Sequence, residues 1–277
     1  MQFVSEALNA VRGDERMRSE ERANLRYSIV IPALNEAENI AVSINALLDQ
    51  TVSRTDYEIV VVDNASTDKT AEAALLAGAD KVVVETQRGT NFARQRGLVE
   101  SSGAIVAFLD ADCLPPPDWL ERAGEILDRP DVKAVSGPCD FGFTGLPWLV
   151  DLIYARHFIP KLDRLLFFVF RKKAGAIMGG NFAARRDTLD AIGGLPPFKF
   201  HGDDSAVAML ISRKVGRVVF DGNFRVKSSP RRFEREGHLR LVLTYAWYYL
   251  KNYFFLDVGS PTVTEVEIQT STAIVIQ

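Results

Sequence analysis

Ile105-Val-Ala-Phe-Leu-Asp-Ala-Asp112 is an apolar run of five residues followed by two carboxylates that one alanine separates. A short run of this kind predicts a buried strand over residues 105–109. Three strand-like runs precede it at residues 27–32, 58–62 and 81–84, and stretches with helical spacing at 36–49, 67–77 and 91–101 separate the four runs. Short strands that alternate with helices predict an α/β fold with a mostly parallel central sheet covered by helices on both faces.

The ends of these elements carry local signals. We expect Asn35 to cap the helix at residues 36–49, with acidic side chains in its first turn. Beyond residue 145 the periodicity becomes irregular, and the aromatic and aliphatic stretch at residues 148–170 ends in Arg171-Lys-Lys173. We then expect a strand at residues 179–184, a helix that ends at residue 192, a helix from Asp203 and an aromatic helix at residues 239–255.

Composition excludes several classes of protein. A formal net charge of -3 over 277 residues gives no basic surplus for a nucleic-acid backbone, so we expect no nucleic-acid partner. The two cysteines, Cys113 and Cys139, lack the spacing of a disulfide framework or a zinc site. No apolar run reaches signal-peptide or membrane-spanning length, which favours a cytoplasmic protein.

Ligands of open α/β sheets bind beyond the carboxyl ends of the strands, and here those positions are polar. If the chain stays extended, Asp110 and Asp112 point the same way, and two aligned carboxylates suit Mg²⁺ or Mn²⁺ that also binds substrate phosphates. The alternative is a solvated Asp-x-Asp turn. Asp63 ends another strand and can accept a hydrogen bond from a base N–H or a ribose hydroxyl, whereas Ser66 and Asp68 are explained as helix caps.

The chain resembles the family 2 glycosyltransferases of the GT-A fold over residues 27–232. The resemblance rests on an ordered set of motifs, each of them weak alone: Ile-Pro-Ala-Leu-Asn-Glu36, Val-Val-Asp-Asn-Ala-Ser-Thr-Asp68, Ala93-Arg-Gln-Arg-Gly97, Phe-Leu-Asp-Ala-Asp112, Gly179-Gly-Asn-Phe-Ala-Ala-Arg-Arg186 and Gly202-Asp-Asp204. It implies a GT-A catalytic domain at 26–232, with a nucleotide-sugar-binding half at 26–137 and an acceptor half at 138–232. A charged extension would precede it at 1–25, and an aromatic helix and tail would follow at 233–277.

The resemblance also implies roles for residues of the donor site. Asp110 would contact the ribose or a metal-bound water and form the metal site together with Asp112. The residues that would surround the nucleoside or diphosphate are Pro32, Ala33, Glu36, Asp63 and Arg94. Arg231 and Arg232 could form a lid over the diphosphate, because guanidinium groups suit bidentate oxyanion contacts.

Asp204 would be the general base that deprotonates the acceptor hydroxyl. Inversion requires a base on the face opposite the leaving diphosphate, and the neighbouring carboxylate of Asp203 could raise one pKa toward neutrality. The alternative is that both residues only favour a helix N-terminus. The following residues, Ser205-Ala-Val-Ala-Met-Leu210, lack the second acidic residue and the arginine that the family often has there, and the absence of Gln-x-x-Arg-Trp favours single transfer over polymerisation.

The implied activity is metal-dependent transfer from a UDP- or GDP-sugar to an acceptor, lipid-linked or glycan, that the sequence does not identify. The alternatives are a sugar nucleotidyltransferase, whose Gly-rich loop is missing after residue 32, and a catalytically silent nucleotide-sugar-binding module. His201 precedes the base, but a single histidine is usually structural. The aromatic helix together with residues 148–173 could place the protein on the inner face of a membrane as a peripheral protein.

Overall fold

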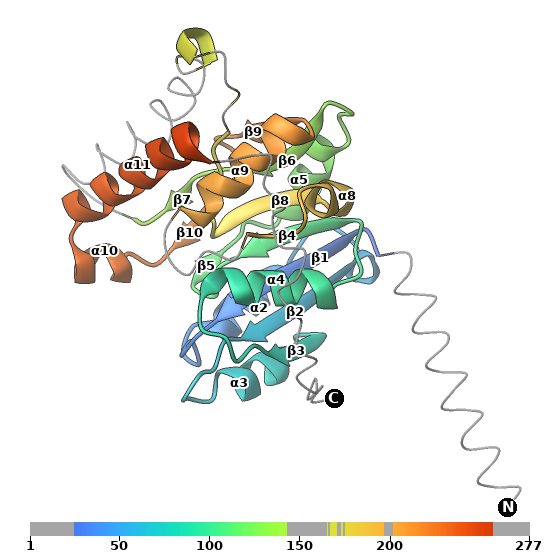
Figure 1. Ribbon diagram of the computed structural model, residues 1–277. Helices are drawn as coiled ribbons and strands as arrows, with labels where there is room; N and C mark the ends of the chain where they lie inside the picture. The colour runs from blue at the N-terminus through green and yellow to red at the C-terminus, as the bar shows by residue number, and fades with distance from the viewer. Residues whose placement is uncertain are drawn as a thin grey trace, which may run out of the picture.

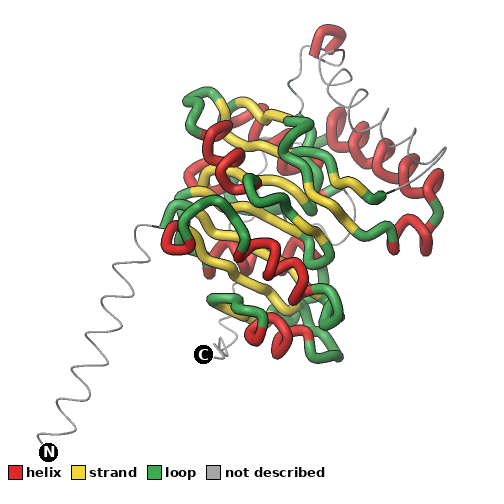
Figure 2. The backbone as a smooth tube through the Cα atoms, turned by 180° about the vertical axis from the view of Figure 1, so that it is seen from behind, coloured by secondary structure: helices red, strands yellow, loops and turns green. Residues whose placement is uncertain are grey.

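The computed structural model describes residues 25–142, 165, 167–170, 173, 175–196 and 202–256. These residues form a seven-stranded sheet with the strand order β3-β2-β1-β4-β8-β6-β9 (Figure 1). Figure 2 shows the same sheet from behind, with helices on both of its faces. The predicted α/β class and the mostly parallel sheet are therefore confirmed.

The first half of the sheet is entirely parallel. Its strands are β1 (Tyr27–Ala33), β2 (Tyr57–Asp63), β3 (Lys81–Val84) and β4 (Ile105–Leu109). The elements that connect them are α2 (Ile40–Leu48), the short 3-10 helix η1 (Arg54–Asp56), α3 (Thr70–Leu76) and α4 (Thr90–Glu100). Parallel pairing places the carboxyl ends of β1, β2 and β4 at one edge of the sheet.

The second half is mixed. Strand β8 (Asn181–Arg185) runs antiparallel to both of its neighbours, β4 and β6 (Val132–Ser136), and β9 (Arg217–Phe220) is parallel to β6. The helices of this half are α5 (Trp119–Leu127), α8 (Arg186–Ala191) and α9 (Asp203–Lys214). The predicted strand at 179–184 is thus confirmed.

A small sheet and two helices complete the described fold. The small sheet has the order β5-β10-β7, and its strands are β5 (Cys113–Leu114), β10 (Val226–Ser228) and β7 (Cys139–Asp140). After β10 come α10 (Arg231–Glu236) and the 18-residue α11 (His238–Phe255). None of the described helices combines the length and the hydropathy that crossing a bilayer requires.

The strands bury both of their faces, which explains their continuous apolar sequence. In β1, Ile29 and Ile31 belong to one core cluster and Val30 to the other. Helix α4 covers the second face, and Gly97 lets it approach closely, because a Cβ atom there would lie 2.2 Å from a Val30 methyl carbon. A side chain at position 97 would therefore push α4 off the sheet.

One predicted boundary is wrong. Helix α2 begins at Ile40 rather than at residue 36, its N-cap is Asn39, and its first turn contains no acidic residue. Asn35 does not cap it: its φ of 55° is left-handed, and its side-chain Oδ1 accepts a hydrogen bond from the Thr67 N–H. The polar residues after β1 thus join two loops instead of starting a helix. The other predicted ends agree with the structure to within three residues.

Candidate active site

Polar side chains gather at the edge where β1, β2 and β4 end. Asp63 is the last residue of β2, and Asp110 directly follows β4. Since β1 lies between these two strands, Asp63 and Asp110 come from strands that are two positions apart in the sheet. This edge faces α9, α10 and α11 (Figure 1), and their residues complete the site.

The loop after β2 is held by its own polar side chains. The Oδ1 atom of Asp63 accepts a hydrogen bond from the Ser66 N–H at 3.0 Å, and Ala65 adopts a left-handed φ of 61°. Asn64, a residue of this motif for which the sequence predicted no role, donates to the carbonyl oxygens of Glu85 and Gln87. Its Oδ1 also accepts from the Gly89 N–H at the start of α4. Asn64 therefore fixes the helix that carries Arg94.

Arg94 is buried between carboxylates from the two halves of the chain. Its Nη2 contacts Asp110 Oδ1 at 2.8 Å, and its Nη1 contacts Asp203 Oδ2 at 3.2 Å. The backbone of Gly179 passes so close that a Cβ there would lie 3.0 Å from both terminal nitrogens. With 5% of its surface exposed, Arg94 contacts carboxylates of the protein, and its expected contact with the base or diphosphate stays a prediction.

Asp204 lies at the N-terminus of α9, beside Asp203. Burial, and then the negative charge of Asp203, raise the pKa of Asp204 to about 7. The backbone N–H groups of Ser205 and Gly179, together with the Arg94 charge, oppose this rise only in part. A carboxyl group with a pKa near 7 exchanges protons readily at neutral pH, which suits a general base.

A second arginine bridges the other carboxylates. The Arg231 Nη2 lies 3.0 and 2.9 Å from the two Glu36 carboxylate oxygens and 3.1 Å from Asp112 Oδ2. Burial raises the pKa of Asp112, and the negative charges of Asp110 and Glu36 add to the rise, although the hydrogen bond from Arg231 lowers it. Two carboxylates, those of Glu36 and Asp112, therefore share the single guanidinium of Arg231.

The expected extended conformation of residues 110–112 is wrong. The chain turns directly after β4, so Asp110 contacts Arg94 while Asp112 contacts Arg231. The two carboxylates still lie close enough for the charge of Asp110 to raise the pKa of Asp112. Among the described residues, no group of three His, Cys, Asp or Glu side chains forms a complete metal site.

The two arginines that were expected to form a lid diverge. Arg232 pairs with Glu236 at 3.3 Å, and its guanidinium lies 5.7 Å from the centre of the Tyr245 ring on α11. Burial raises the pKa of Tyr245 to about 12, and the negative charge of Asp204 contributes to the rise. Arg231 thus contacts carboxylates at the end of the sheet, whereas Arg232 contacts a side chain of α11.

The sequence did not predict that α11 packs next to the candidate base, Asp204. The Asn252 Nδ2 donates to the Gly202 carbonyl at 2.6 Å and to Ser205 Oγ at 2.8 Å. Helix α11 is therefore hydrogen-bonded to one residue before Asp204 and to one residue after it. The amide side chain of Asn252 inside an aromatic helix was the available signal. His201 and most of the aromatic stretch at 148–170 lie outside the described residues.

The sequence matches a known family of enzymes. The family described as Glycosyl transferase family 2 matches residues 28–193. Over 121 residues the chain is 40% identical to the glycosyltransferase AglE of Haloferax volcanii, a match that covers 42% of this chain and 40% of that protein. It is 34% identical over 107 residues to the dolichol-phosphate mannosyltransferase of Pyrococcus furiosus, covering 37% of this chain and 30% of that protein.

The fold resembles a solved mannosyltransferase. The structure of PcManGT from Pyrobaculum calidifontis, in complex with GDP-Man and Mn²⁺, matches with a TM-score of 0.64 at 29% identity. That match covers 82% of this chain and 63% of the mannosyltransferase. The chain spans between about a third and two thirds of the length of these three proteins.

Proposed function

Because this chain belongs to glycosyl transferase family 2, we propose that it is an inverting, metal-dependent glycosyltransferase that transfers one sugar per turnover from a nucleoside diphosphate sugar to an acceptor hydroxyl. One observation carries the proposal: a carboxylate with a pKa of about 7, Asp204, is linked to the strand-end Asp110 through Asp203 and the buried Arg94. This link supports the proposal that Asp204 acts as a base next to the donor site.

The proposed base acts on the acceptor. In its ionised form Asp204 accepts the proton of the acceptor hydroxyl while that oxygen attacks the sugar carbon that bears the diphosphate. The N–H groups of Ser205 and Gly179 keep the carboxylate oriented, and Arg94 holds Asp203 so that its charge stays beside the base. The diphosphate leaves from the opposite face of the sugar, so the configuration of that carbon inverts.

The donor is assigned to the edge where β1, β2 and β4 end. Pro32, Ala33 and Asp63 border the nucleoside in this proposal, since they are the last residues of adjacent parallel strands. Arg231 is half exposed and has a flexible side chain, so it can exchange its protein carboxylates for the diphosphate. Arg232, which points to α11, is assigned to the acceptor side instead of the lid.

The carboxylates at this edge fit a divalent cation. Asp110 and Asp112 offer hard oxygen ligands. Burial is the main cause of the raised pKa of Asp112, and the negative charges of Asp110 and Glu36 add to it, so a bound cation would favour the ionised form of this carboxyl group. Two carboxylates plus the phosphates of a bound donor form the kind of site that Mg²⁺ or Mn²⁺ prefers. When bound, the cation would neutralise negative charge on the leaving diphosphate.

The donor and acceptor are proposed by class. A GDP-sugar is the first candidate, because the similar mannosyltransferase was solved with GDP-Man and Mn²⁺, and a UDP-sugar is the second. For the acceptor we propose a hydroxyl group of a lipid-linked or glycan molecule, and the similarity to a dolichol-phosphate mannosyltransferase favours the lipid-linked form.

The test screens GDP- and UDP-sugars by thermal shift with and without Mn²⁺, since a ligand of the folded state raises its melting temperature. We expect Mn²⁺-dependent stabilisation that Asp112→Asn abolishes. Asp204→Asn should keep this stabilisation and lose transfer or donor hydrolysis. Turnover by the Asp204 variant would remove Asp204 as the base. Metal-dependent binding without turnover by the unaltered chain would favour a silent binding module, and release of diphosphate from a nucleoside triphosphate and a sugar phosphate would favour a nucleotidyltransferase.

A further inference from the structure

Helix α11 carries apolar side chains on two of its faces. The inner face packs on the protein: Leu241 and Tyr253 are buried, and Tyr253 forms a cluster with Met209 of α9. A second stripe faces solvent, with Leu243 60% and Trp247 67% exposed and Leu250 and Phe254 following at helical spacing. A helix that needs only one apolar face to join its domain has no folding reason for the second.

The stripe is continuous with a second exposed apolar segment. The Phe170 ring lies 5.1 Å from the Phe254 ring and 6.1 Å from the Tyr253 ring, which places the segment at 167–170 beside the end of α11. Nine of the sixteen exposed large hydrophobic residues in the described part of the chain belong to α11 and residues 167–170, although these two segments are a small share of it. Single exposed apolar residues are ordinary, but a cluster of this kind marks an interaction surface.

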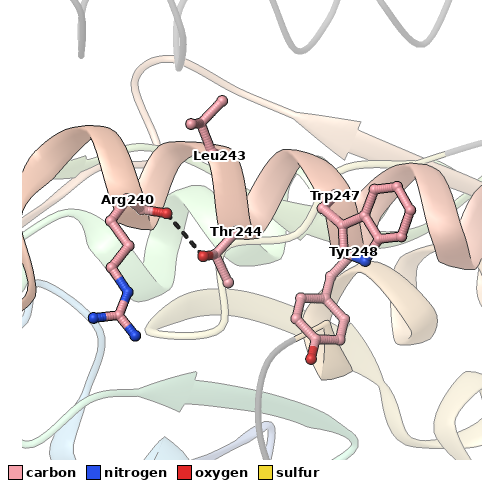
Figure 3. Close-up of a pocket in the computed structure, with 5 residues that line it drawn as sticks. All are labelled: Arg240, Leu243, Thr244, Trp247 and Tyr248. Atoms are coloured by element: carbon pink, nitrogen blue, oxygen red, sulfur yellow. Dashed lines mark hydrogen bonds between the residues drawn. The ribbon is translucent and has the colours of Figure 1, made fainter.

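Charge on this surface has one sign. Helix α11 contains Arg240 and Lys251, both exposed, and no Asp or Glu. Lys173, which follows the second segment, is also exposed. Arg240, Leu243, Thr244, Trp247 and Tyr248 line a hollow on the helix (Figure 3). Arg240 precedes Leu243 by three residues, so it lies next to the stripe on the helix surface.

We propose that this surface, the stripe Leu243, Trp247, Leu250 and Phe254 with the segment 167–170, docks on a lipid bilayer that contains anionic lipids. Apolar and aromatic side chains flanked by basic residues insert at the boundary between headgroups and acyl chains, and the cations contact anionic headgroups. A second copy of the chain fits less well, because a symmetric contact would place Arg240 and Lys251 against a face that has no carboxylate to pair with them.

Docking would fix the distance of the candidate base from the lipid. Tyr248 and Asn252 of α11 contact Gly202, two residues before Asp204. One helix, with a diameter of about 10–12 Å, therefore separates the base from the bilayer surface. This consequence rests on the proposed function, but the docking itself does not, and it can be measured without donor, metal or acceptor.

The experiment is co-sedimentation of the full chain with vesicles of phosphatidylcholine alone or with about one third phosphatidylglycerol, a fraction chosen to give an anionic surface. We expect binding to the anionic vesicles that weakens as salt rises. The double variant Leu243→Ser/Trp247→Ser should bind at least about tenfold more weakly, because two large apolar side chains no longer leave water. Leu76→Ser is the matched control, since Leu76 is 83% exposed but lies on α3, and it should bind like the unaltered chain.

Tryptophan fluorescence supplies a second readout. Of the three tryptophans, Trp247 is exposed and Trp119 is fully buried. In a chain that carries Trp148→Phe, insertion should therefore shift the Trp247 emission to shorter wavelength, and adding Trp247→Phe should keep binding but lose that shift. Unchanged melting temperatures of the variants would show that they fold. The proposal is overturned if no vesicle is bound, if the double variant and Leu76→Ser bind equally, or if the double variant abolishes a dimer of a chain that binds no vesicles.

Discussion

Replacing Asp204 by asparagine should stabilise the protein at alkaline pH. A carboxyl pKa raised from its ordinary value to about 7 means that the native state holds a proton that the unfolded state has already released. Stability must therefore fall as pH rises from about 4 to about 7, because over that range the native state binds more protons than the unfolded state. Below this range Asp204 is protonated in both the native and the unfolded state. Above it Asp204 is ionised in both states, and the full cost of burying its charge lowers the stability of the native state.

The structure sets the size of the effect. A rise of about three pKa units corresponds to about 4 kcal/mol at 1.36 kcal/mol per unit. Asp204 keeps partial contact with solvent, so about half of this, or about 2 kcal/mol, is the expected gain for Asp204→Asn. For a folded unit of this size the gain amounts to a melting temperature about 4–8 °C higher than that of the unaltered chain at pH 8.

The assay is a series of thermal melts of both proteins between pH 4 and pH 9. The difference in melting temperature should be near zero at pH 4, grow up to about pH 7 and stay constant above it. Transfer by the unaltered enzyme should rise with pH over the same range as Asp204 ionises. A difference that is the same at every pH would refute the reasoning, since it would mean that the charge of Asp204 costs the native state nothing.

Two further predictions concern the arginines. Arg94→Lys keeps the positive charge but can hold only one of the two carboxylates. We therefore expect a loss of about 2 kcal/mol in the free energy of unfolding, measured by thermal melts, and a fall in kcat that is larger than the change in KM. Arg122, whose ion pair with Asp118 is exposed, supplies the control, because Arg122→Lys should change neither stability nor activity. Arg231→Gln should increase the affinity for Mn²⁺ without nucleotide by about threefold, the worth of an exposed ion pair, and weaken donor binding, both measured by calorimetry. Equal Mn²⁺ affinities would show that Arg231 does not compete for the carboxylates.

The parts of the fold that could be predicted are those that local sequence determines. Strand β4 has the predicted ends because five apolar residues in a row are buried on both sides of a sheet, and polar residues stop the run. The start of α2 could not be found in this way. Asn35 and Glu36 look like a cap and a first turn, but their partners lie more than thirty residues away, Thr67 in the loop after β2 and Thr70 at the start of α3.

The candidate site divides in the same manner. The acidic residues at the strand ends were predictable, because parallel strands bring their carboxyl ends together. The partners of Arg94 were not, since Asp110 and Asp203 lie 16 and 109 residues away and only the packing of α9 against the sheet brings the second one near. The different partners of Asp110 and Asp112 depend on a turn that the spacing of two residues does not reveal.

The three-stranded sheet restricts how Arg231 can leave Asp112. Cys113, the neighbour of Asp112, pairs with Ser228 across β5 and β10, and β10 is paired with β7 on its other side. Both ends of the Arg231–Asp112 contact thus start from one rigid ladder, and only residues 229 and 230 lie between that ladder and Arg231. A swing of α10 has to pivot at this two-residue joint, so stiffening or loosening it should change how fast a nucleotide enters and leaves while the carboxylates stay in place.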